Sequence, residues 1–213
     1  MDPHAPSQEQ LRALMKVAAI VPSDFYLAGG VAFAAYFGHR SSRDLDLFSS
    51  ECDVSSLAAA LEHNGARIES TSRGTIHAVV AGIPVSLIEY KYPLLLEPQR
   101  VESYASPLAS LPDLIAMKLS ALASRGARRD FWDLYVATTA TPSLSPPSGV
   151  LAFTPEQCLT FFARKFSQQD LGHVVRSLSY FADAENEPMP RGMDDALWSK
   201  IVAHFRQLAG SIR

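Results

Sequence analysis

Residues 25–49, FYLAGGVAFAAYFGHRSSRDLDLFS, decide the fold of this chain. The stretch opens on a short apolar run that is typical of a strand, and the pair Gly29–Gly30 breaks that run. The alanine-rich segment 31–40 is apolar almost all round, as a buried helix is. Residues 44–48 then alternate acidic and apolar side chains, which is the period-two pattern of a strand with one polar face. The stretch therefore predicts a strand, a helix and a second strand.

The sequence on either side extends this unit into an α/β core. Helical spacing of apolar residues predicts helices over 8–20 and 54–65, and alternating or apolar runs predict strands over 66–71, 75–82 and 83–90. From residue 110 the pattern is helical, with segments near 111–125, 128–137, 155–166, 168–183 and 193–208, and a Pro/Ser/Gly-rich loop at 139–149. We therefore expect a mixed-sheet core over about 1–105 and a helical region over 106–213.

Composition narrows the class of protein. Hydrophobic residues make up 47% of the 213 residues, enough for a buried core, and the net charge of −3 argues against binding nucleic acid by bulk electrostatics. The two cysteines, Cys52 and Cys158, lack metal-site spacing, which favours a reduced compartment. The sequence shows neither a signal peptide nor an apolar run of the roughly 20 residues that a membrane helix needs. We expect a cytoplasmic protein that does not bind a membrane.

The strongest chemical pattern is the glycine pair followed by Asp44 and Asp46. Two carboxylates two positions apart on a strand share a face, and they repel each other unless a cation lies between them. Oxygen ligands suit Mg²⁺ or Mn²⁺. Gly29 and Gly30, at the start of a helix, can offer backbone N–H groups to a phosphate. The alternative is an exposed edge strand after an ordinary turn, but the combination in this order favours a phosphoryl-transfer site.

A second charged cluster lies on the helices after residue 110. Lys118 and Arg125 are two helical turns apart, and Lys118 sits in an apolar segment where an unpaired lysine would be costly. Arg129, Asp130 and Asp133 follow at helical spacing. Either the cluster is an ordinary salt-bridge network, or Lys118 and Arg125 hold a triphosphate with Asp130 close by.

The loop before the acidic pair carries further candidates. Arg40 and Arg43 flank the expected strand, where they are either solvated charges or phosphate contacts. We count Arg43 with Arg125 and Arg129 among the predicted nucleotide-binding residues. His39 precedes them in the same loop and is the one histidine that lies close to the predicted site in sequence.

These motifs resemble a known family. Residues 25–49 are similar to the first motif of the AbiEii/AbiGii nucleotidyltransferase-like toxins of type IV toxin–antitoxin systems, and 106–135, SPLASLPDLIAMKLSALASRGARRDFWDLY, resemble the second and third motifs. The resemblance implies a polymerase-β-like nucleotidyltransferase core, with an NTP and Mg²⁺ as ligands. It also implies a cognate antitoxin and an RNA acceptor, because related toxins modify tRNA 3′ ends.

Carried over by residue, the resemblance assigns roles to the predicted site. Gly29 and Gly30 would meet the phosphates, Asp44 and Asp46 the metal, Lys118 the nucleotide, and Asp130 would be the essential acid.

Two departures weaken the match with the family pattern. Val31 stands where many members have a hydroxyl residue, and Ser86 occupies the usual place of a third metal carboxylate. Glu89, three residues on, should face away from Asp46 if the strand is regular. The general-base role of a third acid is then vacant or falls to Asp130.

We therefore expect a nucleotidyltransferase that moves NMP from an NTP to an acceptor hydroxyl of tRNA or of a protein, as the toxin component of a toxin–antitoxin pair. One alternative is a degenerate member that binds a nucleotide or a partner without turnover. Another is a D-x-D glycosyltransferase.

Overall fold

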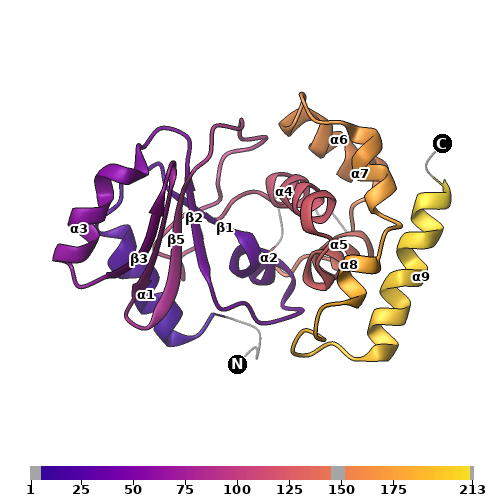
Figure 1. The fold of residues 1–213 in the computed structure, drawn as a ribbon, viewed down its shortest axis with the longest axis horizontal. Coiled ribbons are helices and arrows are strands. Elements are labelled where there is room, and N and C mark those ends of the chain that lie inside the picture. The colour runs from indigo at the N-terminus through magenta and orange to yellow at the C-terminus, as the bar shows by residue number, and fades with distance from the viewer. Residues whose placement is uncertain (1–5, 145–151, 212–213) are drawn as a thin grey trace. The chain divides into compact units, whose positions relative to one another are not determined.

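Residues 6–144 and 152–211 are described by the computed structural model. The chain divides into two compact units, Met1–Ser110 and Leu111–Arg213 (Figure 1). The predicted division lay five residues earlier, between 105 and 106.

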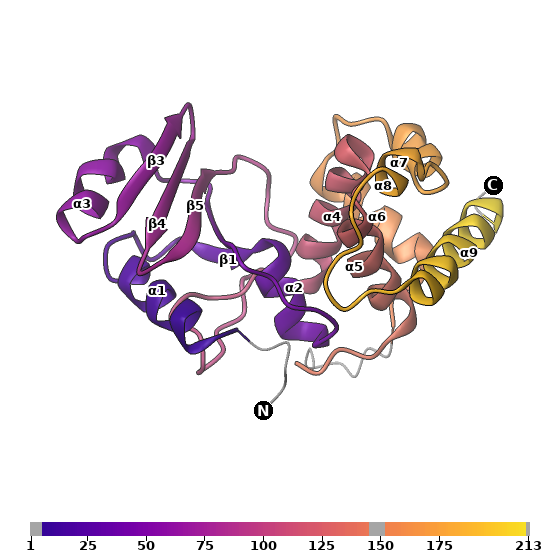
Figure 2. The same ribbon diagram turned by 60° about the horizontal axis from the view of Figure 1, so that its bottom comes forward.

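The first unit is built on a five-stranded mixed sheet. Its elements are α1 (Gln8–Ala18), β1 (Tyr26–Ala28), α2 (Gly29–Phe37), β2 (Leu45–Ser49), η1 (Val54–Leu57), α3 (Ala58–His63), β3 (Arg67–Ser72), β4 (Thr75–Val80) and β5 (Ile83–Glu89). The strands lie in the order β1-β2-β5-β4-β3, and Figure 2 shows β3, β4 and β5 side by side. β2 and β5 run parallel and every other neighbouring pair is antiparallel. The predicted mixed-sheet α/β core is confirmed.

Alternation along the central strands gives the sheet one apolar face and one mixed face, on which Asp46 lies beside the buried Phe48. Leu45 and Leu47 of β2, with Val85 and Leu87 of β5, are buried on the face that α1 and η1 cover. The opposite face carries Asp46, which is half-buried. The hydrophobic core of this unit therefore lies behind β2, and its candidate site lies in front.

Several element ends differ from the sequence prediction. α2 already includes both glycines of the turn, and it ends at Phe37, followed by the left-handed cap Gly38, whose φ is +59° and whose N–H donates to Ala34 O. Asp44 precedes β2 instead of lying within it. The predicted helix 54–65 is a 3₁₀ turn followed by α3. Hydrogen bonds at the two ends of a helix or strand set where it begins and ends, and the spacing of apolar residues carries no information about these bonds.

The second unit is all helical. It contains α4 (Leu111–Arg125), α5 (Arg128–Thr139), α6 (Pro155–Lys165), α7 (Leu171–Ser177), α8 (Ala182–Glu185) and α9 (Asp195–Ser211). Phe131 of α5 is fully buried, and its ring contacts those of Phe181, Trp198 and Phe205. The single helix predicted over 168–183 is two helices, α7 and α8. Of the predicted loop 139–149, residues 145–149 lie outside the described part of the chain.

In the described ranges, no helix has the length and hydropathy needed to cross a membrane. Cys52 and Cys158 are both free, and burial raises the pKa of the Cys158 thiol to about 12.

Candidate functional site

Gly29 brings the backbone at the start of α2 against the carboxylate of Asp46. Ala28 pairs with Asp46 across β1 and β2, so the next residue lies at the level of this side chain. Gly29 has a φ of +65°, and a Cβ built there would collide with Asp46 Oδ2. Only glycine fits both the left-handed backbone and this close approach. The contact brings the glycine turn and one residue of the acidic pair together, and their role as one site stays a prediction.

Gly30 is enclosed in the same way by the loop between α2 and β2. A Cβ at Gly30 would lie 2.5 Å from Ser42 Oγ and 3.0 Å from Arg40 Nη2. Arg40 is only 6% exposed, so it is not the solvated loop charge that one interpretation of the sequence allowed. The loop thus places a hydroxyl and a guanidinium at the positive end of α2, where anions bind favourably.

The other candidates of this loop are placed differently. Asp44 and Arg43 are both exposed. The ring of His39 packs edge-on against Phe33 and Phe37 of α2, at centroid distances of 6.0 and 6.3 Å. Arg40, one of the two loop arginines that the sequence offered as phosphate contacts, lies against the glycine turn together with Ser42, which the sequence did not single out. Ser42 was marked only by its place in the short, polar connection before Asp44.

Strand β5 pairs with the acidic strand β2, so its side chains lie beside Asp46. Ser86 pairs with Asp46 in register, and Ser86 Oγ lies 3.1 Å from His77 Nδ1 of β4. Glu89 pairs with Ser49 at the end of the strand and forms a 2.8 Å ion pair with Lys91. The prediction that Ser86 shares the face of Asp46 and that Glu89 turns away is confirmed by this register.

The chemistry of the donor set fits a hard divalent cation. Asp44 and Asp46 offer oxygen ligands that solvent can reach, and Gly29 leaves room beside Asp46 for the backbone alone. Across the described ranges, no group of three His, Cys, Asp or Glu side chains converges into a metal-binding cluster. Mg²⁺ suits such a sparse set, because it usually keeps several of its waters and takes one or two carboxylates from the protein.

In the second unit, the predicted cluster is a buried ion network between α4 and α5. Lys118 Nζ lies 3.0 Å from Asp130 Oδ1 and 2.7 Å from Asp133 Oδ2. Arg125 donates from Nε to Asp130 Oδ2 at 2.7 Å and from Nη2 to Asp130 Oδ1 at 2.9 Å. The premise that Lys118 is unpaired is therefore wrong, because two fully buried carboxylates neutralise it.

The same ion network sets the protonation state of the Asp130 carboxyl. Burial raises the pKa of the Asp130 carboxyl, but the charge of Lys118 and the hydrogen bonds from Arg125 outweigh burial and hold the pKa below its usual 3.8. The carboxylate is ionised at neutral pH with both oxygens engaged. A group in this state is a poor proton acceptor, which argues against Asp130 as the general base.

The two arginines that precede Asp130 in α5 have opposite environments. Arg128 is buried, donates from Nε to Ala184 O at 2.6 Å, and stacks over Trp198 at 4.9 Å from the ring centroid. Arg129, the predicted nucleotide-binding residue, is exposed. Arg128 therefore joins α5 to the helices after it, and Arg129 keeps its charge at the surface.

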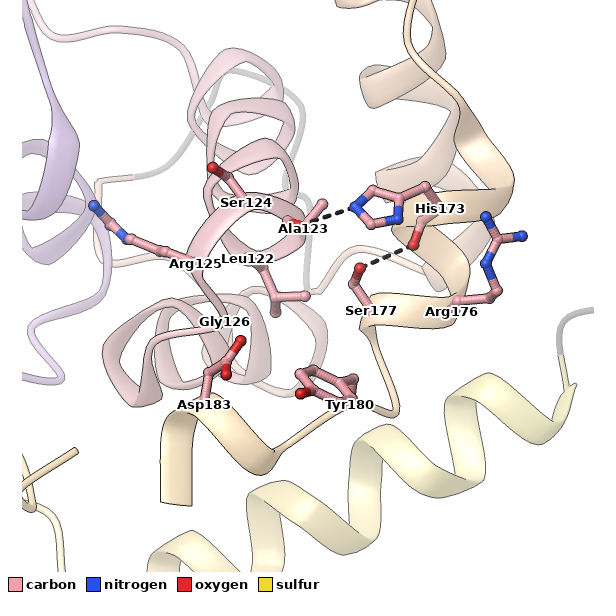
Figure 3. Close-up of a pocket in the computed structure, with 10 residues that line it drawn as sticks. All are labelled: Leu122, Ala123, Ser124, Arg125, Gly126, His173, Arg176, Ser177, Tyr180 and Asp183. Atoms are coloured by element: carbon pink, nitrogen blue, oxygen red, sulfur yellow. Dashed lines mark hydrogen bonds between the residues drawn. The ribbon is translucent and has the colours of Figure 1, made fainter. Parts of the chain in front are cut away.

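A cavity of about 320 Å³ opens at the C-terminal end of α4 (Figure 3). Of the predicted site residues, Arg125 lines it, but in Figure 3 its side chain extends from α4 away from His173. His173 Nε2 lies 3.0 Å from Ala123 O, and Arg176 pairs with Asp170 at 3.2 Å. These polar groups connect elements of the fold, so we assign no ligand to the cavity.

Comparisons with known proteins agree with this architecture. The sequence model of the family described as "Nucleotidyl transferase AbiEii toxin, Type IV TA system" matches residues 12–84 and 79–211. An uncharacterised protein of Aquifex aeolicus is 32% identical over 205 residues, which is 94% of each chain.

Two solved structures show a similar fold. MenT4, a nucleotidyltransferase toxin of Mycobacterium tuberculosis, superposes with a TM-score of 0.61 at 16% identity, over 96% of this chain and 82% of its own. A candidate nucleotidyltransferase of H. pylori gives 0.52 at 16% identity, over 94% and 92%.

Proposed function

Because the chain belongs to the AbiEii family of nucleotidyltransferase toxins, we propose that it transfers NMP from an NTP to an acceptor hydroxyl with Mg²⁺ or Mn²⁺ at Asp44 and Asp46. Membership in this family also excludes the glycosyltransferase alternative. The divalent ion would neutralise charge on the phosphates and on the leaving pyrophosphate. All other contacts to the substrate would come from the side chains and backbone of the protein.

The observation that carries the proposal is the fit of the two glycines against the acidic strand. Gly29 fits directly against Asp46, and Gly30 against Ser42 and Arg40. A triphosphate bound at the start of α2 would therefore meet backbone N–H groups and a guanidinium on one side and metal-binding carboxylates on the other. Arg43, exposed in the same loop, would add a further phosphate contact.

For the second unit, we propose that the exposed arginines Arg125 and Arg129 meet the nucleotide and that the buried Asp130 holds Arg125 in place. The Arg125 side chain is 49% exposed although its guanidinium is fixed by Asp130, and Arg129 is exposed as well. Lys118, which the family resemblance assigns to the nucleotide, and Asp130, to which it assigns the role of the essential acid, would then act through a preformed network. A residue fixed in this way loses little conformational freedom when it binds a phosphate.

We further propose that the acceptor is an RNA, that a cognate antitoxin restrains the activity, and that both are met in the cytoplasm. An RNA acceptor presents the hydroxyl that in-line attack on the α-phosphorus requires. The net charge of −3 implies that such an RNA is held by local contacts instead of by a basic surface.

Transfer of label from α-³²P-NTPs tests the proposal. Each of the four NTPs is incubated with total tRNA and Mg²⁺ or Mn²⁺, and the wild type is compared with the double variant Asp44→Asn/Asp46→Asn. We expect labelled RNA with the wild type and none with the double variant, which should also lose Mn²⁺ binding in calorimetry. Glu89→Gln, on the opposite face and paired with Lys91, is the matched control and should retain activity.

A different outcome would favour the degenerate alternative, for which Val31 and Ser86 are the specific observations. In that case the wild type binds NTP in calorimetry but transfers no label to any RNA. Equal Mn²⁺ binding by the wild type and the double variant would show that the metal does not bind at these carboxylates.

A further inference from the structure

Gln10 of α1 reaches across to the loop that leads into the acidic strand. Its carboxamide Nε2 donates to Ser42 O at 2.8 Å and to Arg43 O at 3.1 Å. Its Oε1 accepts from Ser7 N at 2.9 Å. Gln10 as a whole is only 7% exposed, and its hydrogen bonds are partly buried, so water competes with them less than at the surface. One buried amide thus fixes two consecutive carbonyls directly before Asp44.

The loop that Gln10 holds has little structure of its own. The segment 39–44 forms neither helix nor strand, and it connects the end of α2 to the first residue of β2. Two consecutive carbonyls held from one side leave the backbone few alternative dihedral angles. The backbone that leads into Asp44 is therefore positioned by α1 as well as by β2.

Ser42 links this clamp to the other half of the site. Its carbonyl accepts from Gln10, and its hydroxyl lies against Gly30, where a Cβ would approach it to 2.5 Å. If the loop moved, the space in front of the α2 N-terminus and the position of Asp44 would change together.

The helix cap alone does not account for glutamine at this position. Ser7 and Gln10 form a capping box, in which Gln10 N donates to Ser7 Oγ and the side-chain oxygen accepts from Ser7 N. A glutamate would serve that box equally well, because only an acceptor oxygen is needed. A glutamate would also put a carboxylate oxygen against two carbonyl oxygens. The amide nitrogen is what the loop requires.

We propose that Gln10 is a positioning residue of the catalytic site: it clamps the Ser42 and Arg43 carbonyls so that Asp44 stays aligned with Asp46 for divalent metal binding. The role in metal binding rests on the proposed function. The clamp on the loop itself does not, and it can be measured without metal or nucleotide.

Three variants of the full chain separate the clamp from the cap. Gln10→Met keeps the length of the side chain but removes both sets of hydrogen bonds. Gln10→Glu keeps the cap acceptor and removes only the clamp donor. Ser7→Ala removes the hydroxyl of the cap and leaves the amide nitrogen of Gln10 in place. Amide hydrogen exchange of the peptide that spans 41–44 is measured without metal, and Mn²⁺ affinity is measured by calorimetry.

We expect faster exchange at 41–44 in Gln10→Met and Gln10→Glu, and wild-type exchange there in Ser7→Ala. The Mn²⁺ affinity of Gln10→Met should fall by about tenfold, the lower end of the effect of removing an outer-shell support, with Ser7→Ala unchanged. Wild-type exchange at 41–44 in both Gln10 variants would overturn the clamp. Faster exchange with unchanged Mn²⁺ affinity would overturn its role at the site. Absence of Mn²⁺ binding in the wild type would instead overturn the proposed function, and the alignment role with it.

Discussion

At the scale of single residues, the geometry of the site depends on positions where a side chain would occupy the space of another. Gly29 combines a left-handed backbone with direct contact to the Asp46 carboxylate. Gly65 has the same kind of backbone, with a φ of +81°, but no atom lies within 4 Å of a Cβ built there. The two glycines therefore separate the cost of the backbone conformation from the cost of displacing a functional group.

We predict that Gly29→Ala and Gly65→Ala cause similar backbone strain but have different affinities for Mn²⁺. Each substitution should lower the free energy of unfolding by about 1–2 kcal/mol, the cost of a left-handed non-glycine residue. Gly29→Ala should lose further stability and most of its Mn²⁺ affinity, because Asp46 must move. Urea unfolding and calorimetry on both variants provide the measurement. Wild-type Mn²⁺ affinity in Gly29→Ala would contradict the proposed metal site.

At the scale of elements, buried charge connects the helices of the second unit. Lys118 joins α4 to two carboxylates of α5, and Lys165 of α6 pairs with Asp113 of α4 at 2.7 Å, with both side chains fully buried. Pairs of this kind add little net stability over well-packed apolar residues, but the loss of one partner leaves an uncompensated buried charge. They make the packing of α4 against its neighbours specific.

We predict that Lys118→Met destabilises the fold by about 3–5 kcal/mol, because Asp133 and Asp130 would lose their shared cation. A lysine that only held a triphosphate would instead weaken NTP binding and leave the fold intact. Urea unfolding at pH 7 measures the loss. Arg176→Met, which breaks the exposed pair with Asp170, is the control and should leave the unfolding midpoint unchanged. A loss in Lys118→Met no larger than that of the control would contradict a structural role for the network.

The same network predicts a pH dependence with a definite sign. The folded-state pKa of Asp130 lies below its ordinary value of 3.8, so its ionisation stabilises the fold above that pH, and the contribution is lost as pH falls through the folded-state value. We expect the stability advantage of the wild type over Asp130→Asn to be constant near neutral pH and to shrink on acidification below about pH 4. Urea midpoints for both proteins between pH 7 and pH 3 test this. An advantage that grows towards pH 3 would show the opposite linkage.

At the scale of the whole molecule, the chain consists of two units with separate cores. In Met1–Ser110 the core lies behind the sheet, around Leu47 and Leu87, and in Leu111–Arg213 it surrounds Phe131. About 100 residues with a core of their own are enough for a domain to fold alone.

We predict that fragments 1–110 and 111–213 each fold. The first should retain Mn²⁺ binding through Asp44 and Asp46, and the second should show helical circular dichroism with a cooperative urea transition. Label transfer should require the full chain, since the proposed nucleotide contacts come from both units. A first fragment that folds but fails to bind Mn²⁺ would show that the metal site needs residues beyond 110.

The local patterns of the sequence predicted the architecture because the spacing of buried side chains along a helix or a strand is set by the geometry of its backbone. Alternation placed Asp46 on a polar strand face, and Gly38 ended α2 where its left-handed conformation allowed. Alternation also put Ser86 and Glu89 on opposite faces of β5. The pairing of β1 with β2 that brings Gly29 to Asp46, and the register that sets Ser86 beside Asp46, were decided by the sheet.

By itself, then, the sequence determined the order and type of the elements, the glycine turn with its acidic pair, and the family. Only the tertiary structure decided which distant groups meet. Gln10 lies 32 positions before the Ser42 carbonyl that it holds, Lys118 finds its carboxylates on the next helix, and Arg40 is buried instead of solvated. Such contacts depend on how the elements pack. Packing leaves each side chain a limited space and leaves polar groups that still need a hydrogen-bond partner, and these two constraints fix the position of the side chain. A local pattern has no access to that information, because residues far apart in sequence become neighbours only once the core has formed.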